Sequence, residues 1–245
     1  RNSKIRRFKG FRYNAAFHKT GDFIRMTKMS PLLERASETL KIEIAGLEGL
    51  IERLDAEFEQ AVNLLFACQG KVILAGMGKS GLIAQKIAAT LTSTGTPSLF
   101  LHAGESSHGD LGIITRQDVV IVFSYSGETS EVVQMIGHIH AIGVPLIAMT
   151  GKPNSTLAKA ATVHLSIAVE KEACPLGLTP TASSTATLAL GDALAMCLLE
   201  LRKFREDDFA MFHPGGSLGR KLTIKIKDVM VAGDSLPVVP ENMPM

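Results

Sequence analysis

Five short apolar runs, separated by segments with helical periodicity, constrain the fold of this 245-residue chain more than any other feature. The runs cover residues 72–75, 98–101, 119–123, 146–149 and 163–167. Helical patterns cover 80–91, 130–142 and 155–161, and a longer one covers 181–201. Short buried strands that alternate with helices are typical of an α/β fold, in which helices cover both faces of a parallel sheet. Such sheets bind ligands at the carboxyl ends of their strands, so we expect function in the loops after the runs.

The loop after the third run, Ser-Tyr-Ser-Gly-Glu-Thr at 124–129, leads into a predicted helix. Hydroxyl groups and free backbone N–H groups converge there on one helix N-terminus, where the helix dipole favours an anion. No Lys or Arg lies in this segment, so neutral donors would hold most of the anion. The sequence therefore predicts a site for the phosphate of a small metabolite, and the alternative is an ordinary capping turn.

The loop after the first run, Gly-Met-Gly-Lys-Ser-Gly at 76–81, matches the pattern G-x-G-x-x-G. A dinucleotide site also needs an acid at the end of the second strand, but the second run is followed by His102, and the next acid is Glu105. A P-loop fails as well, because it requires Gly at position 73, which is Ile. Lys79 at the helix start is either a cation for a phosphate or an oxyanion, or a solvated loop lysine.

Histidines and acids gather in further loops. Residues 102–110 contain two His and two acids, which suit a divalent metal, a proton shuttle or a polar loop whose histidines bond backbone carbonyls. Glu128 and Glu131 lie in a first helical turn, where the dipole stabilises any acid. Glu172 follows the fifth run and can act as a base, provided that burial raises its pKa from about 4.3.

Composition excludes several functions. Nine of the 26 Lys and Arg residues but one of the 24 acids lie in residues 1–28, so the rest carries 17 basic against 23 acidic side chains. An acidic body argues against nucleic acid as a partner. Three cysteines without C-x-x-C spacing favour a reducing cytosol. The longest apolar stretch, 185–201, is interrupted by Asp192 and Glu200, so we expect no membrane span.

The two ends differ from the middle of the chain. Residues 1–28 form a basic arm, which we interpret as disordered or non-native, with a targeting segment or a nucleic-acid tail as alternatives. Ser30, Pro31 and Glu34 predict a helix start, with an N-cap, a Pro at the first position and an acid in the first turn. The character changes again after Lys221. We therefore expect one domain over 29–222 and an incomplete second domain over 223–245.

Six motifs together resemble the sugar isomerase (SIS) domain superfamily, and most closely its arabinose-5-phosphate isomerases. They are the glycine loop at 76–81, Ser-Thr-Gly-Thr-Pro at 93–97, His-Gly-Asp-Leu-Gly at 108–112, Ser-Gly-Glu at 126–128, Lys-Glu-Ala-Cys-Pro-Leu-Gly-Leu at 171–178 and His-Pro-Gly-Gly at 213–216. The last two are far more specific than the glycine loop. The resemblance runs from about Leu32 onward, and the tail resembles the beginning of a CBS module.

This resemblance implies a three-layer αβα sandwich with a five-stranded parallel sheet, which is a flavodoxin-like arrangement. It implies that D-ribulose 5-phosphate and D-arabinose 5-phosphate are interconverted through an enediol, supplying Kdo for lipopolysaccharide or capsule. It also implies a cytoplasmic homotetramer that binds a small sugar phosphate and neither nucleic acid nor membrane. No cofactor is required, and an inhibitory zinc would bind near His102. The alternatives are an SIS isomerase for another sugar phosphate and a non-catalytic sugar-phosphate sensor.

The resemblance also assigns roles residue by residue. The catalytic set is Lys79, His108, Glu131, Glu172 and His213. Phosphate contacts come from Ser80, Ser124, Ser126 and Thr129, while Gly95, Thr96 and His102 line the substrate site. We hypothesise that Glu172 moves the proton between C2 and C1 and that the histidines shuttle protons. Lys79 would stabilise the enediolate, and Glu131 would orient Lys79 or a histidine.

One position departs from the family pattern. Tyr125 stands between the two serines of the 124–129 loop, where the family usually has Asn. If its side chain points into the site, the fit of the substrate changes. If only its backbone N–H faces the phosphate, the change is harmless, and the sequence leaves both alternatives open.

Overall fold

The computed structural model describes residues 30–213 and 230–231. The predicted basic arm, 1–28, lies outside these residues. So does the predicted second domain, 223–245, except for Met230 and Val231.

Five parallel strands form one sheet in the order β2-β1-β3-β4-β5. They are β1 (Val72–Gly76), β2 (Ser98–His102), β3 (Val119–Phe123), β4 (Leu146–Thr150) and β5 (Val163–Ser166), which confirms the five predicted runs. The chain runs outward from β1 to β2 and then returns to the other side of β1 as β3, so the strand order reverses between β1 and β3. In sheets of this type, a ligand binds at the carboxyl ends of the strands beside that reversal.

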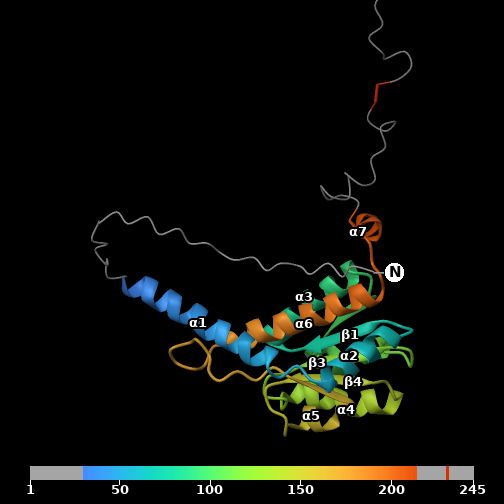
Figure 1. Ribbon diagram of the computed structural model, residues 1–245. Helices are drawn as coiled ribbons and strands as arrows, with labels where there is room; N and C mark the ends of the chain where they lie inside the picture. Colours follow the sequence, from blue (N-terminus) through green and yellow to red (C-terminus); the bar gives the residue numbers. More distant parts are fainter. Residues whose placement is uncertain (1–29, 214–229, 232–245) are drawn as a thin grey trace, which may run out of the picture.

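Helices cover both faces of the sheet (Figure 1). One face carries α1 (Pro31–Ile51), α2 (Ala56–Ala67), α3 (Gly78–Ser93) and α6 (Ala182–Leu201). The other carries α4 (Ser130–Ile142), α5 (Thr156–Ala160) and the 3-10 helices η1 (Ala103–His108) and η2 (Asp110–Ile113). Alternate residues of each strand point to opposite faces: Leu74 packs in the first core and Ile73 in the second. The three-layer αβα sandwich is confirmed.

The helix boundaries follow local signals in the sequence. Ser30 caps α1 by accepting a hydrogen bond from the Leu33 N–H at 3.4 Å, and Pro31 is the first helical residue, as predicted. The predicted bounds of α4 are confirmed. The sequence analysis missed the two 3-10 helices and α7 (Glu206–Phe212), because segments this short show no clear periodicity.

The long helix α6 is a core helix. Its length and composition are those of a membrane span, but half of its most apolar window is buried in the protein. It packs against α1, α2 and α3. A Cβ at Gly191 would lie 2.2 Å from the Cδ1 atom of Ile87, so the small residue lets α6 approach α3 closely.

Candidate active site

The glycine loop and the serine loop, residues 124–129, follow the two strands that flank the reversal of strand order. Gly76 at the end of β1 pairs in register with Phe123 at the end of β3 and with His102 at the end of β2. Adjacent strands lie about 4.8 Å apart. The loops after β2, β1 and β3 therefore begin side by side at one edge of the sheet, and the sequence prediction that they share an edge is confirmed.

The serine loop is organised by its own hydroxyl groups. Ser124 is buried, and its Oγ accepts a hydrogen bond from the Gly127 N–H at 3.1 Å and shares one with the Thr129 Oγ1 at 2.9 Å. The exposed Ser126 accepts a hydrogen bond from the Glu128 N–H at 3.2 Å through its Oγ. The loop is thus held in one shape before any ligand binds.

Helix α5 buttresses this loop from behind. Gly127 has a φ of +67°, and a Cβ there would lie 2.5 Å from the Cβ of Ser155, so both backbone shape and space favour glycine. The Gly127 carbonyl accepts a hydrogen bond from the Leu157 N–H at 3.1 Å. The Glu128 carboxylate accepts one from the Thr156 N–H at 2.8 Å, and this bond lowers the pKa of Glu128. Glu128 therefore caps α5.

Tyr125 points away from the substrate side of the loop. Its ring covers Gly151, where a Cβ would lie 2.6 Å from the Tyr125 Cε2, and its hydroxyl accepts a weak hydrogen bond from the Val169 N–H at 3.4 Å. The side chain also packs against the first core. Of the two alternatives that the sequence left open, the structure supports the harmless one.

Lys79 and Ser80 lie in the first turn of α3, at the same edge of the sheet. Helices α3 and α6 run parallel, because both begin at this edge and end at the opposite one (Figure 1). They meet at Ile87 and Gly191. Both helices rise by about 1.5 Å per residue. Lys79 thus lies in the first turn of α3 and Ser183 in the first turn of α6, each eight residues before that contact.

Glu172 is anchored at the start of α6. Its Oε2 atom accepts hydrogen bonds from the Thr181 N–H at 2.7 Å, the Thr181 Oγ1 at 2.9 Å and the Ser183 N–H at 3.3 Å. Burial raises the pKa of Glu172, but the hydrogen bonds from Ser183 and Thr181 outweigh it and hold the pKa below its usual value. The condition set for a base role, a pKa raised by burial, is therefore not met, because the donors at the helix start stabilise the carboxylate.

The two histidines of the 102–110 loop are exposed, His102 at the end of β2 and His108 at the end of η1. Across residues 30–213 and 230–231, no three His, Cys, Asp or Glu side chains form a group that would hold a metal ion. The donors around His102 therefore do not make a three-ligand zinc site within one subunit, and weaker binding of zinc there stays a prediction.

Glu131 has its side-chain partner next to it in the sequence. Its carboxylate accepts a hydrogen bond from the Ser130 Oγ at 2.8 Å. Its own backbone N–H and then Ser130 lower its pKa. Within the described residues, the side-chain ion pairs involve neither Glu131 nor Lys79. The partners of Glu131 within the described residues therefore do not include Lys79, and the role of Glu131 in orienting Lys79 or a histidine stays a prediction.

Three predicted site residues lie apart from this edge. Gly95 and Thr96 precede β2, and the six residues after Thr96, up to the end of that strand, span about 20 Å, while Thr96 is buried against Arg202. His213 follows α7, in a groove lined by residues of α3 and β2 such as Gln85 and Phe100. The structure does not bring these three to the site of their own subunit, because β2 and the length of α3 intervene.

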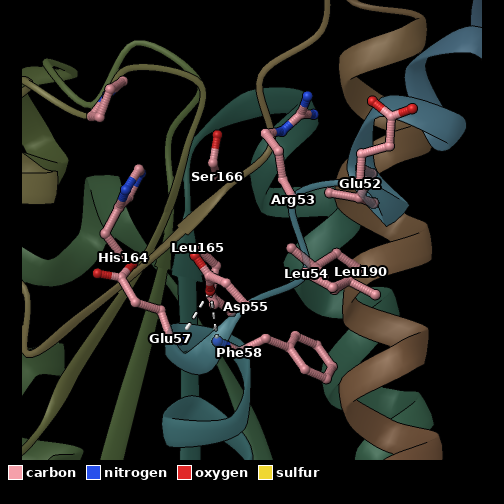
Figure 2. Close-up of a pocket in the computed structure, with 12 residues that line it drawn as sticks. Glu52, Arg53, Leu54, Asp55, Glu57, Phe58, His164, Leu165, Ser166 and Leu190 are labelled. Atoms are coloured by element: carbon pink, nitrogen blue, oxygen red, sulfur yellow. Dashed lines mark hydrogen bonds between the residues drawn. The ribbon is translucent and has the colours of Figure 1, made fainter.

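A cavity of about 480 Å³ lies beside the edge strand β5, under the connection between α1 and α2 (Figure 2). Its wall includes Arg53 and His164, and the predicted site residues do not line it. Arg53 donates a hydrogen bond from Nη2 to the Ala168 carbonyl at 2.6 Å. This wall therefore supports the chain between β5 and Glu172.

Comparison with known proteins identifies the family. A family model described as SIS domain matches residues 65–197, which is more than half of the chain. The chain belongs to the SIS domain family.

The relatives of this SIS domain include named enzymes. Arabinose 5-phosphate isomerase KdsD of Escherichia coli (strain K12) is 53% identical over 206 residues, which cover 84% of this chain and 63% of KdsD. KdsD of Pseudomonas aeruginosa is 50% identical over 216 residues, covering 88% of this chain and 66% of that protein. The structure of E. coli CFT073 c3406 in complex with arabinose 5-phosphate is 42% identical, with a TM-score of 0.73, and covers 76% of this chain and 100% of c3406.

The chain spans about 63% of the length of the first of these curated relatives. The matched residues include β1 to β5 and the loops at their carboxyl ends. Membership of the family therefore concerns the part of the chain that holds the candidate site.

Sequence reasoning missed the residues that support the site of this SIS domain. Thr181 anchors Glu172, and Glu128 caps α5. The signal for Thr181 was its place at the very start of the long helical pattern 181–201, where Thr is typical of an N-cap. Nothing in the sequence linked it to a carboxylate nine residues earlier.

Proposed function

We propose that this SIS domain interconverts D-arabinose 5-phosphate and D-ribulose 5-phosphate. One observation carries the proposal: an ionised carboxylate, Glu172, is held at the edge of the sheet where the serine loop presents its preorganised donors. The substrate in this proposal comes from two relatives. About half of the matched residues are identical in KdsD, and the structure of c3406 is a complex with arabinose 5-phosphate.

The site residues divide into two groups in this mechanism. Ser124, Ser126, Thr129 and Ser80 hold the phosphate with hydroxyl and backbone N–H donors. Glu172 removes the C2 proton of the open-chain aldose and returns it to C1 of the enediol. Glu172 is ionised at neutral pH and can therefore accept this proton, although its lowered pKa makes it a weaker base than a raised pKa would.

The remaining groups manage charge on the sugar oxygens. Lys79, at the start of α3, stabilises the enediolate oxygen, and His108 moves protons between O1 and O2. His213 opens the sugar ring from a neighbouring subunit, since it lies apart from the site of its own subunit. His102 and Gly95 complete the substrate site, Gly95 likewise from another subunit, while the buried Thr96 supports the backbone beside Gly95.

We propose that the protein works as a cytoplasmic homotetramer, needs no cofactor and supplies Kdo for lipopolysaccharide or capsule. Support for assembly comes from α1, where one helical face leaves large apolar side chains more than half exposed: Leu33, Leu40, Ile44 and Ile51. Light scattering after gel filtration tests the tetramer.

We retain the domain division 1–28, 29–222 and 223–245 as part of this proposal. Support comes from α1, which lies before the matched residues 65–197 yet packs along α6 within them. The second of these domains therefore extends beyond the match.

A coupled assay tests the activity. Ribulose 5-phosphate and fructose 6-phosphate are offered separately, each with and without EDTA. We expect turnover of the pentose phosphate alone, unchanged or raised by EDTA if zinc inhibits. Turnover of the hexose phosphate would instead identify a different isomerase, and binding without turnover would identify a sensor.

Glu172→Gln tests the base. The amide keeps an oxygen that accepts the hydrogen bonds from Thr181, so the fold should persist while turnover falls at least ~100-fold. Glu128→Gln is the matched control, because Glu128 also caps a helix start but has no role in proton transfer. Near-normal turnover in Glu172→Gln would show that Glu172 is only a cap.

A further inference from the structure

The hydrogen bonds to Glu172 are strongly asymmetric. All three donors, the Thr181 N–H, the Thr181 hydroxyl and the Ser183 N–H, reach the same oxygen, Oε2. In the part of the chain that the structure describes, the hydrogen bonds of ordinary geometry to this carboxylate all go to Oε2; the Ser183 side chain also lowers the pKa of Glu172 but makes none of these bonds. One oxygen of the carboxylate is thus fixed, and the other is left to exchange a proton.

The Thr181 hydroxyl has a defined direction. Its oxygen accepts a hydrogen bond from the Ala173 N–H at 2.8 Å. An ionised carboxylate only accepts hydrogen bonds, so the single hydroxyl proton must point at Oε2 of Glu172. One side chain therefore holds both the carboxylate and the backbone of the next residue.

Thr181 is itself fixed by the core. It is the N-cap of α6, and the next two residues, Ala182 and Ser183, are buried. On the other side of Glu172, Arg53 bonds the Ala168 carbonyl. The segment that carries Glu172 is therefore held at both ends, and Thr181 is the contact closest to the carboxylate.

We infer that Thr181 is a positioning residue for the reaction: its hydroxyl and N–H hold Oε2 of Glu172 so that Oε1 faces the substrate. This inference rests on the proposed isomerase function. The hydroxyl also favours the ionised form of Glu172, since it donates to the charged oxygen. Removing it should disturb the chemical step and leave phosphate binding intact, because the serine loop belongs to another part of the site.

Thr181→Val and Thr181→Ser test the inference. Valine keeps the shape and removes the hydroxyl, whereas serine restores the donor. We expect Thr181→Val to lower kcat about tenfold with KM nearly unchanged, as for the loss of one hydrogen bond to a charged group. The acid limb of its pH profile should move to higher pH, because Glu172 then protonates more readily. Thr181→Ser should recover most of kcat and the original acid limb.

Thr185→Val is the matched control. The Thr185 hydroxyl lies one turn further along α6 and donates to the Glu43 carboxylate at 3.1 Å, so this variant removes a similar hydrogen bond away from the site. Its kcat and acid limb should match those of the wild type. Thermal melts of all variants show whether a loss of kcat follows a loss of fold.

Two kinetic results would overturn the inference: a wild-type kcat and acid limb in Thr181→Val, or an equal loss in Thr181→Ser. Titration of the ¹³C-labelled Glu172 carboxyl gives a second measurement that needs no turnover. If the wild type fails to convert either pentose phosphate, the isomerase proposal fails by itself. Even then, a higher pKa of Glu172 in Thr181→Val would support the hydrogen bond from Thr181 to Oε2, and an unchanged pKa would reject it.

Discussion

Gly127→Ala should displace the serine loop, and its cost can be worked out from two contributions. The first is backbone conformation: a φ of +67° costs an L-residue about 1–2 kcal/mol. The second is space, because the new Cβ would lie 2.5 Å from the Cβ of Ser155. Carbon atoms pack at roughly 3.5–4.0 Å, so loop and helix α5 must separate by about 1 Å.

That separation would stretch two hydrogen bonds between the loop and α5. They run from the Leu157 N–H to the Gly127 carbonyl at 3.1 Å and from the Thr156 N–H to Glu128 at 2.8 Å. Such bonds contribute about 1 kcal/mol each. The free energy of unfolding should therefore fall by about 3–4 kcal/mol, and KM for the sugar phosphate should rise more than kcat falls.

The assay is urea denaturation followed by far-UV circular dichroism, with two comparison variants. Gly143→Ala has the same kind of backbone, with φ at +82°, but nothing lies within 4 Å of its new Cβ, so it should lose only about 1–2 kcal/mol. Adding Ser155→Gly to Gly127→Ala removes the clash. The double variant should therefore lose about as much stability as Gly143→Ala, plus a few tenths of a kcal/mol because the Ser155 cap of α5 is lost. Equal losses for Gly127→Ala and Gly143→Ala would refute the reasoning.

Three further predictions concern the sheet edges and the serine loop. Burial raises the pKa of Asp118, but hydrogen bonds from Lys71 and Thr115 outweigh it and lower the pKa. The stabilisation that ionised Asp118 gives to the fold is therefore complete above the usual pKa of Asp, and it is lost as the pH falls through the lowered pKa. Asp118→Asn should cost about 3 kcal/mol at neutral pH and flatten the acid dependence of urea unfolding, whereas the exposed Asp192→Asn should cost under about 1 kcal/mol. Tyr125→Phe loses one 3.4 Å hydrogen bond, so unfolding and kcat/KM should change little, and a large loss of kcat/KM would place the hydroxyl in the site. Ser124→Ala and Ser126→Ala should both raise KM, and an effect on kcat alone would contradict their assignment to phosphate. Calorimetry should show a lower Tm for Ser124→Ala only, because Ser124 is buried.

The sequence was informative wherever a signal is local. The apolar runs predicted all five strands, because a strand buried on both faces needs apolar residues at every position. The helix start at Ser30 and Pro31 was readable because a cap involves neighbours three residues apart. The serine loop could be predicted as a phosphate site for the same reason, since its donors are contiguous.

The sequence was less informative about side chains whose partners are distant. It placed Gly95 and Thr96 with the other site residues, although the parallel strand β2 carries the chain from one edge of the sheet to the other. It left the direction of Tyr125 open, because the ring is positioned by Gly151 and Val169 on later segments.

The family and the edge of the sheet that carries the site were thus determined by the sequence itself, through short motifs and the periodicity of apolar residues. The state of the Glu172 carboxylate was decided only by the tertiary structure. The sequence made a base role for Glu172 conditional on a pKa raised by burial, whereas the start of α6 brings three donors to its Oε2. These donors lower the pKa because hydrogen bonds to a charged oxygen outweigh partial desolvation. Such a balance depends on differences of a few tenths of an ångström in donor–acceptor distance. These distances are set by tertiary packing and not by the spacing of residues in the sequence.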